Sequence, residues 1–391
     1  MIPEIEFKKM IDKTLFESAE RDRENQQYFR EARDILVREG LIHRFSARTD
    51  VSDMYYGVID GANLLETNQA MEDVFLSAAT VADGYFTKET PRAEKPYILS
   101  ANAYPHSKAN DRCNSAIMML SEIGVCGSLP HYDIRSMDGA YSTALITLFR
   151  TLKDLSYEQV EPVIDFILGD DSEEIFKGIT ELFNPPTEEG KYIIGLSKSD
   201  STDDFLDENG DLFNPRIREL GLGDHNFASN VLEPGEMFTP FTKKMGTMLK
   251  TTVNGVASYI EDSDGTDEYK DLVHSLYDIG MESTLDNRLY TTYFAPLENG
   301  RAGKVFRIDY SLPKPLTAQD EDELLEHADK TIQVVNRDIV SVDYREPYAQ
   351  AIVDKECKDL VSKCFSSSRE SLRLKLGNSK LGYSATENYR T

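Results

Sequence analysis

The first 42 residues carry apolar side chains at helical spacing. In "DRENQQYFREARDILVREG" (22–40) apolar positions recur at the interval of a helix face, and a glycine follows the last turn. The pattern predicts one long helix. We assign residues 1–45 to an N-terminal helical segment.

Strand-like and helix-like runs then alternate. "YYGVID" (55–60) predicts a first strand, and "NQAMEDVFLSAATVADGYF" (68–86) predicts one or two more. "SKANDRCNSAIMMLSEIG" (107–124) has the spacing of an amphipathic helix, and "HYDIRSMDG" (131–139) alternates like a strand. This order predicts an α/β fold.

The rest of the chain continues the mixture of helices and strands. Its predicted segments are helices over 142–186 up to a double proline, a buried strand in 191–201, an irregular insertion with short helices over 203–250, a hairpin over 288–313, a helix over 317–336 and a last long helix that starts in "REPYAQAIVDKEC" (345–357). Residues 365–391 form a Ser-rich tail with few core residues, which we expect to be mobile.

The composition fits a globular protein. Of 391 residues 40% are hydrophobic, with 20 Tyr and 18 Phe, which is ample for a packed core. The chain contains no apolar run long enough to span a membrane, and its charged start does not resemble a signal peptide, so we expect a cytoplasmic protein. The four cysteines show no CxxC spacing, which predicts free thiols rather than disulfides or a structural zinc site.

The net charge of the chain restricts the possible binding partners only slightly. A formal net charge of −26 argues against a general nucleic-acid coat, because affinity for phosphate backbones comes from Lys and Arg. A nuclease remains compatible with this charge, since its basic residues can gather in one channel.

Two aspartates stand at positions that favour metal chemistry. Asp60 and Asp138 each end a predicted strand and precede a glycine. Carboxylates at adjacent strand ends, joined by an acid from the intervening helix, suit a pair of divalent cations roughly 3.5–4 Å apart. Hard oxygen ligands favour Mg²⁺ or Mn²⁺. The alternative is ordinary turn chemistry, because Asp caps backbone donors and Gly accepts a positive φ.

Six segments resemble the NurA nucleases, which process DNA ends together with the hexameric translocase HerA. In the order found in that family they are "YGVIDGAN" (56–63), "VFLSAATVADG" (74–84), "IRSMDGAYSTALITLF" (134–149), "YIIGLSKSDS" (192–201), "YFAPLENGRAGKVFRIDY" (293–310) and "REPYAQAIVDKEC" (345–357). The resemblance implies an RNase H-like mixed sheet flanked by helices, with a helical insertion. It implies a nuclease domain over 46–364, with insertions at about 150–186 and 203–285, and a homodimer.

The resemblance also implies site residues. Asp60 and Asp138 match the aspartates of the family's two Asp-Gly motifs, and Asp354 falls where the family usually has a histidine or an acid. The chain departs from the family at Asp354, and at Glu346, where many members have a tyrosine before the proline that is Pro347 here. We therefore count Asp60, Asp138, Asp354 and Glu346 among the candidate catalytic residues.

The acid from the helix has two candidates. Asp111 lies in the first turn of the predicted helix, whereas Glu122 lies three turns further on and is expected to point away, so side-chain direction favours Asp111. The separation of Glu122 from Asp138, however, is closer to that expected of the family, and Glu122 stays the alternative.

Four residues of later strands are weaker candidates. Lys198, which ends "IIGLSK", either contacts the scissile phosphate or extends along the strand end to solvent. Tyr293 and Phe294 either stack on a base or belong to the core, and Arg307 is a candidate phosphate contact.

The sequence thus predicts a metal-dependent DNA nuclease with a two-metal site for Mn²⁺ or Mg²⁺. It would act as an exonuclease, an endonuclease or both on DNA ends, with a HerA-type translocase, in end processing or in defence against phage. The alternative is a non-catalytic RNase H-like adaptor subunit of an ATPase complex, in which the carboxylates are capped turns.

Overall fold

The computed structural model describes most of the chain. The described residues are 4–45, 51, 53–67, 71–86, 96–199, 202–242, 251–256, 265–285, 288–297, 305–316, 320–340 and 346–376. Among their helices, none is long and apolar enough to cross a membrane.

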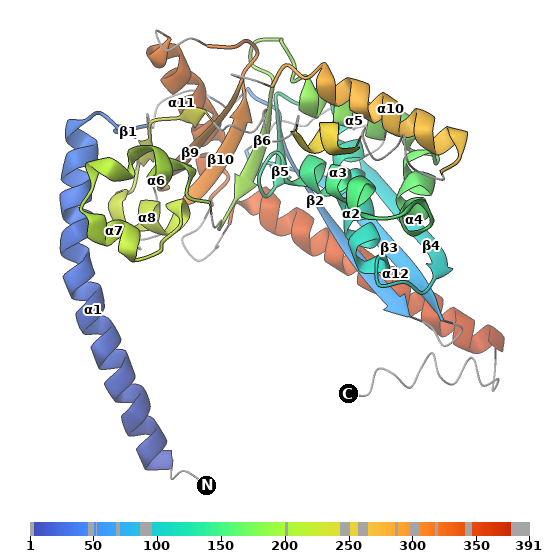
Figure 1. Cartoon of the computed structure of the whole chain (residues 1–391), viewed down its shortest axis with the longest axis horizontal. Coiled ribbons are helices and arrows are strands. Elements are labelled where there is room, and N and C mark those ends of the chain that lie inside the picture. The colour runs from blue at the N-terminus through green and yellow to red at the C-terminus, as the bar shows by residue number, and fades with distance from the viewer. Residues whose placement is uncertain are drawn as a thin grey trace. The chain divides into compact units, whose positions relative to one another are not determined.

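A ten-stranded mixed sheet forms the framework (Figure 1). Its strands are β1 (Ile42–Arg44), β2 (Tyr56–Thr67), β3 (Glu72–Asp83), β4 (Tyr97–Pro105), β5 (Ile134–Asp138), β6 (Tyr192–Ser197), β7 (Glu236–Phe238), β8 (Phe241–Thr242), β9 (Leu289–Phe294) and β10 (Phe306–Ser311). They lie in the order β1-β7-β9-β10-β6-β5-β2-β3-β4, and β8 pairs with β9. β2, β5 and β6 run parallel, whereas β2, β3 and β4 are antiparallel neighbours.

Helices surround these strands. They are α1 (Glu4–Arg38), α2 (Asn110–Gly127), α3 (Thr143–Asp154), α4 (Tyr157–Ile167), α5 (Ser172–Phe183), α6 (Asp204–Asn209), the 3-10 helix η1 (Gly210–Leu212), α7 (Pro215–Glu219), α8 (Asp224–Val231), α10 (Asp267–Met281), α11 (Glu321–Arg337) and α12 (Tyr348–Leu376). The α/β fold with a mixed sheet and flanking helices, predicted from the sequence, is confirmed.

The chain divides into two compact units. Unit 1 comprises residues 1–47, 198–241 and 292–307, and unit 2 comprises residues 48–197, 242–291 and 308–391. Each unit has its own hydrophobic core.

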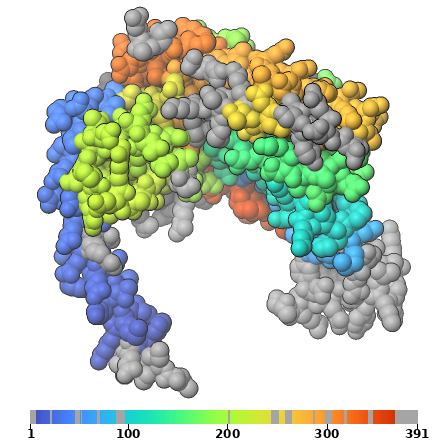
Figure 2. Space-filling model, viewed as in Figure 1, coloured from blue at the N-terminus to red at the C-terminus, as the bar shows by residue number. Residues whose placement is uncertain are grey.

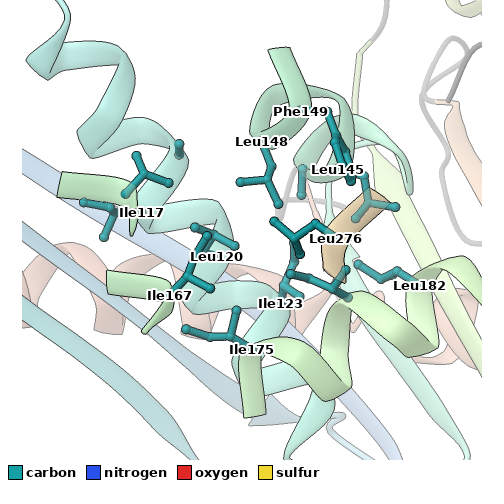
Figure 3. Packing of buried hydrophobic residues seen from close by; sticks show 14 of the residues in the cluster. Ile117, Leu120, Ile123, Leu145, Leu148, Phe149, Ile167, Ile175, Leu182 and Leu276 are labelled. Carbon is teal, nitrogen blue, oxygen red and sulfur yellow. The ribbon is translucent and has the colours of Figure 1, made fainter. Parts of the chain in front are cut away.

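The core of unit 2 is built around α2. Ile117, Leu120 and Ile123 of this helix pack with apolar side chains of α3 and α5 (Figure 3). Buried residues of β2 and β5, including Ile59 and Met137, belong to the same cluster, so one face of these strands packs toward α2. The long helix α12 contacts β2 and β3 and passes behind them in the view of Figure 1. The two strands are thus enclosed between α2 and α12.

Unit 1 holds the C-terminal half of α1. Phe29 and Leu36 of that half are buried with Phe227 and Val231 of α8, and the Arg33 guanidinium pairs with the buried Glu236 carboxylate at 2.6 Å. The N-terminal half of α1 extends beyond α6, α7 and α8 of its own unit (Figure 2). One helix therefore has a half that is packed and a half that is exposed.

Several expected elements are confirmed. They are the N-terminal helix, the strands that begin at Tyr56 and Ile134, the helix predicted over 107–124 (α2), the helices between 142 and 186, the strand β6, the neighbouring strands β9 and β10, and α11. The segment 68–86 contributes one strand, β3.

Other expectations need correction. The strand β4 was not predicted, because its second half exposes three residues in a row, Ala101, Asn102 and Ala103, which show no alternation and have low strand propensity. The segment 203–250 has the expected short helices but also supplies β7 and β8 to the sheet. The helix α12 continues through the first part of the expected Ser-rich tail to Leu376, and residues 377–391 lie outside the described part.

Candidate metal centre

Asp60 is almost fully buried within β2, with 5% of its surface exposed. Its Oδ1 accepts a hydrogen bond from the backbone N–H of Gly61 at 2.7 Å. The prediction that Asp60 ends a strand is wrong, because β2 continues to Thr67 in its pairing with β3. What ends near Asp60 is the parallel pairing of β2 with β5.

Asp138 is the last residue of β5 and is half-buried. The strand stops there because Gly139 takes a φ of +82° and donates its N–H to the carbonyl of Leu196 at 2.9 Å. Since Ile59 pairs with Met137 in a parallel ladder, the following residues, Asp60 and Asp138, stand at the same level and on the same face.

Glu122 brings a third carboxylate from α2. Its side chain is 5% exposed and lies close to the backbone of Gly61. A Cβ placed on Gly61 would lie 2.7 Å from Glu122 Oε1 and 3.0 Å from Met118 Cγ. Only a residue without a side chain lets the carboxylate approach the backbone of β2 this closely, and this explains the glycine after Asp60.

It is electrostatically unfavourable for the carboxylates of Asp60, Glu122 and Asp138 all to be ionised in the metal-free protein. Burial raises the pKa of Glu122 well above its usual range, and the nearby carboxylates of Asp60 and Asp138 raise it further. The nearby backbone of Gly61 opposes this increase. A cation bound at the cluster would reverse the effect, because an opposite charge favours the ionised carboxylates.

The structure does not bring Asp111 to this cluster. Asp111 is exposed in the first turn of α2, eleven residues before Glu122, or about 16 Å along the axis of an ideal helix. The expectation that Glu122 points away from the strands is wrong, because it faces Gly61. The reason is that α2 crosses β2 with its C-terminal half next to Asp60, a placement that side-chain direction on the helix alone does not reveal.

Asp354 and Glu346 lie at the start of the last helix. Pro347 stands directly before the first helical residue, Tyr348, and Glu346 is half-buried next to it. The side chain of Asp354 is 31% exposed, and its Oδ1 pairs with Lys358 Nζ at 2.5 Å. These two residues remain predicted members of the site.

The weaker candidates occupy other positions. Lys198 follows the last residue of β6 and is half-buried, and it remains a predicted phosphate contact. Tyr293 and Phe294 are fully buried, which favours the core interpretation. Arg307 is 1% exposed, and its Nη1 donates to Thr202 Oγ1 at 3.3 Å.

The residue types fit divalent cations, although the side chains are not arranged as a finished site. Asp60, Glu122 and Asp138 offer hard oxygen donors, which Mg²⁺ and Mn²⁺ prefer. Across the described residues, no group of three or more His, Cys, Asp or Glu side chains is close enough to hold an ion as it stands. Metal binding would therefore require the side chains to rotate toward the cation.

One neighbour of the cluster was not found from the sequence. Cys357 of α12 is buried, and its Sγ–H donates to the main-chain oxygen of Asp60 at 3.1 Å. All four cysteines, Cys113, Cys126, Cys357 and Cys364, are free thiols. Nothing in the spacing of the sequence distinguishes Cys357 from the other three.

The mixed sheet, with carboxylates where the parallel strand β5 ends, places the chain in the RNase H-like class of α/β folds. A crystal structure of the NurA nuclease from Sulfolobus solfataricus matches with a TM-score of 0.52 at 12% identity, over 95% of this chain and 98% of that chain. This match shows that the chain has a NurA-like fold.

Two further matches are weaker. A crystal structure of NurA bound to dAMP and manganese has a TM-score of 0.40 at 10% identity, over 83% of this chain and 90% of that one. A Ciona intestinalis endonuclease V in complex with a 24mer DNA has a TM-score of 0.28 at 11% identity, over 88% of this chain and 99% of that one. No protein-family model matches the sequence, and no curated protein matches it significantly.

Proposed function

We propose that the protein is a metal-dependent DNA nuclease. The observation that carries this proposal is the approach of the buried Glu122 carboxylate to the backbone of Gly61, beside Asp60 and level with Asp138. Burial and the carboxylates of Asp60 and Asp138 raise the pKa of Glu122, an energetic cost of ionisation that a bound cation would offset. The NurA-like fold and the resemblance of the six sequence segments support the same conclusion.

The residues of this chain have distinct proposed roles. Asp60, Glu122 and Asp138 would hold the cations, with Asp354 as a further ligand, and Glu346 and Lys198 are further proposed catalytic residues. Divalent cations supply the Lewis acidity that phosphodiester hydrolysis needs. Burial of Asp60 and Glu122 excludes water from their carboxylates, which strengthens their attraction to a bound cation.

The proposed partners follow from the resemblance. The substrate would be single- or double-stranded DNA ends, and a HerA-type hexameric ATPase would deliver the strand to a homodimer of this chain. Delivery by a translocase makes base-specific contacts unnecessary. This arrangement serves either DNA end processing or defence against foreign DNA.

The test is a nuclease assay with labelled DNA, with Mn²⁺ or Mg²⁺, and with or without the translocase. Asp60→Asn, Glu122→Gln and Asp138→Asn should each abolish cleavage while the proteins stay folded. Asp111→Asn is the matched control, since it changes an exposed carboxylate on the same helix as Glu122 and should cleave like the wild type. Cleavage by the three site variants at the wild-type rate would reject the assignment.

One observation favours the adaptor as a second candidate. The hydrogen bond from Gly61 N–H to Asp60 Oδ1 gives this buried carboxylate a partner within the protein, as a non-catalytic carboxylate would have. Calorimetric titration with Mn²⁺ separates the two functions. If the protein is an adaptor, the wild type should bind Mn²⁺ no more tightly than the Glu122→Gln variant. If it is a nuclease, the wild type should bind Mn²⁺ clearly more tightly than that variant.

A further inference from the structure

A buried thiol lies on the backbone that carries Asp60. Cys357 Sγ–H donates to the main-chain oxygen of Asp60 at 3.1 Å. Thr80 of β3 is the register partner of Asp60. The side chain of Cys357 thus contacts the β2–β3 ladder at the residue pair that contains Asp60.

The chemistry of this thiol suits a structural donor. Burial raises the pKa of Cys357 to about 12, and the carboxylates of Asp60 and Glu122 contribute in the same direction. The side chain of Cys357 is fully buried, so its role comes from the hydrogen bond that it makes to the backbone of β2.

The helix that carries Cys357 is held at a second point. The Asp338 carboxylate accepts the N–H of Ala349, in the first turn of α12, at 2.8 Å, and the N–H of Tyr85 at 2.8 Å. Asp354 lies between this capped end and Cys357. Two separate contacts therefore set the position of the segment of α12 that contains Asp354.

We propose that Cys357 is a positioning residue for the carboxylate cluster. By bonding the carbonyl of Asp60, it holds α12 against β2, so that the backbone at Asp60 and Gly61 keeps a fixed position beside Glu122. The inference rests on the proposed function for its metal-binding consequence. Its structural consequence, a restrained backbone at Asp60 and Gly61, stands without it.

A second cysteine offers a matched control. Cys113 of α2 is also fully buried, and its Sγ–H also donates to a main-chain carbonyl, that of Gln159, at 3.2 Å. Removing either thiol costs similar packing and one similar hydrogen bond. Only Cys357 contacts the backbone of a proposed metal ligand.

The experiment compares Cys357→Ala, Cys357→Ser and Cys113→Ala with the wild type. Calorimetry with Mn²⁺ measures metal affinity, and hydrogen–deuterium exchange of the metal-free proteins measures opening at Asp60 and Gly61. We expect Cys357→Ala to weaken Mn²⁺ binding roughly tenfold or more, as loss of a group that orients a ligand typically does. Its exchange at Gly61 should also be faster. Cys357→Ser keeps a donor and should restore most of both properties, and Cys113→Ala should change neither.

The two readouts separate the possible failures. If Cys357→Ala exchanges at Gly61 and binds Mn²⁺ like Cys113→Ala, the positioning role is rejected. If the wild type binds no Mn²⁺, the proposed function fails, and the exchange data alone then decide about Cys357. Faster exchange confined to Cys357→Ala supports the positioning role, and equal exchange in the two alanine variants rejects it.

Discussion

Gly61 controls how close a carboxylate comes to the backbone of β2. The atom that a new Cβ would meet at 2.7 Å is the end of the flexible Glu122 side chain, which can move away. Gly61→Ala should therefore leave the fold intact but displace Glu122. We expect a loss of Mn²⁺ affinity and of cleavage close to that of Glu122→Gln, with a change in the free energy of unfolding of only about 1 kcal/mol.

Calorimetry and urea unfolding on the same Gly61→Ala sample check this expectation. A variant that binds Mn²⁺ like the wild type would show that the close approach of Glu122 has no functional role. A variant that does not fold would show that the side chain of Met118, at 3.0 Å, cannot adjust.

The raised pKa of Glu122 makes the stability of the metal-free protein depend on pH. A carboxyl group whose pKa is higher in the folded than in the unfolded state stabilises the fold fully below the unfolded value, 4.5 for a glutamate, and loses this contribution as the pH rises through the folded value. Glu122→Gln removes the titration. In EDTA, this variant should therefore be more stable than the wild type at pH 7, and the difference should shrink toward pH 4.5.

Urea unfolding across this pH range measures that difference, which amounts to about 1.4 kcal/mol for each pKa unit of the shift. The other carboxylates titrate in both proteins and cancel in the comparison. A difference that does not vary with pH would mean that Glu122 ionises normally in the folded protein. Added Mn²⁺ should stabilise the wild type more than the variant, because the cation favours the ionised form.

At the scale of elements, α12 carries two similar ion pairs with different proposed roles. Asp354 pairs with Lys358 at 2.5 Å, and Asp359 pairs with Lys363 at 3.2 Å, each four residues apart. Such partly exposed pairs contribute about 0.3–0.5 kcal/mol, so loss of either should hardly affect stability. If Asp354 is a metal ligand, Asp354→Ala should lose most activity and Mn²⁺ affinity.

Asp359→Ala is the control, and it should behave like the wild type in the same titration. Asp354→His should keep some activity with weaker metal binding, because a neutral imidazole can ligate but adds no negative charge. Equal Mn²⁺ affinity of Asp354→Ala and Asp359→Ala would make Asp354 an ordinary carboxylate of the helix surface.

At the scale of the whole molecule, the proposed homodimer needs an apolar contact surface. The N-terminal half of α1 exposes Phe7, Ile11 and Leu15, which follow helical spacing and are 55%, 42% and 62% exposed. If this face contributes to association, the double variant Ile11→Glu with Leu15→Glu should shift the protein toward the monomer in light scattering at micromolar concentration. It should also lose co-migration with the translocase.

Leu168→Glu is the matched control, because Leu168 is an exposed leucine at the end of α4 in unit 2. It should leave both measurements unchanged. A wild type that is monomeric and does not co-migrate with the translocase would contradict the proposed assembly as a whole.

Local patterns of the sequence identified most of the elements that carry the cluster. The periodicity of residues 107–124 located α2, a short apolar run located β2, and alternation located β5, because each pattern reflects the burial of the element itself. The Asp-Gly pair at Asp138 was recognised correctly as a strand end for the same local reason. The three-residue strand β7 is too short to show a period, and it forms only because β1 and β9 lie beside it.

The choice between Asp111 and Glu122 was decided by the tertiary structure. Both are acidic residues of one helix, and the sequence shows where each stands on that helix but not where the helix crosses the sheet. The crossing depends on packing between residues distant in the chain, such as Glu122 against Gly61 and Cys357 against Asp60. The sequence by itself therefore determined most of the elements and two of the carboxylates, Asp60 and Asp138. The packing of α2 and α12 on β2 decided which other side chains lie beside these carboxylates, because that packing is set by long-range contacts that no local pattern encodes.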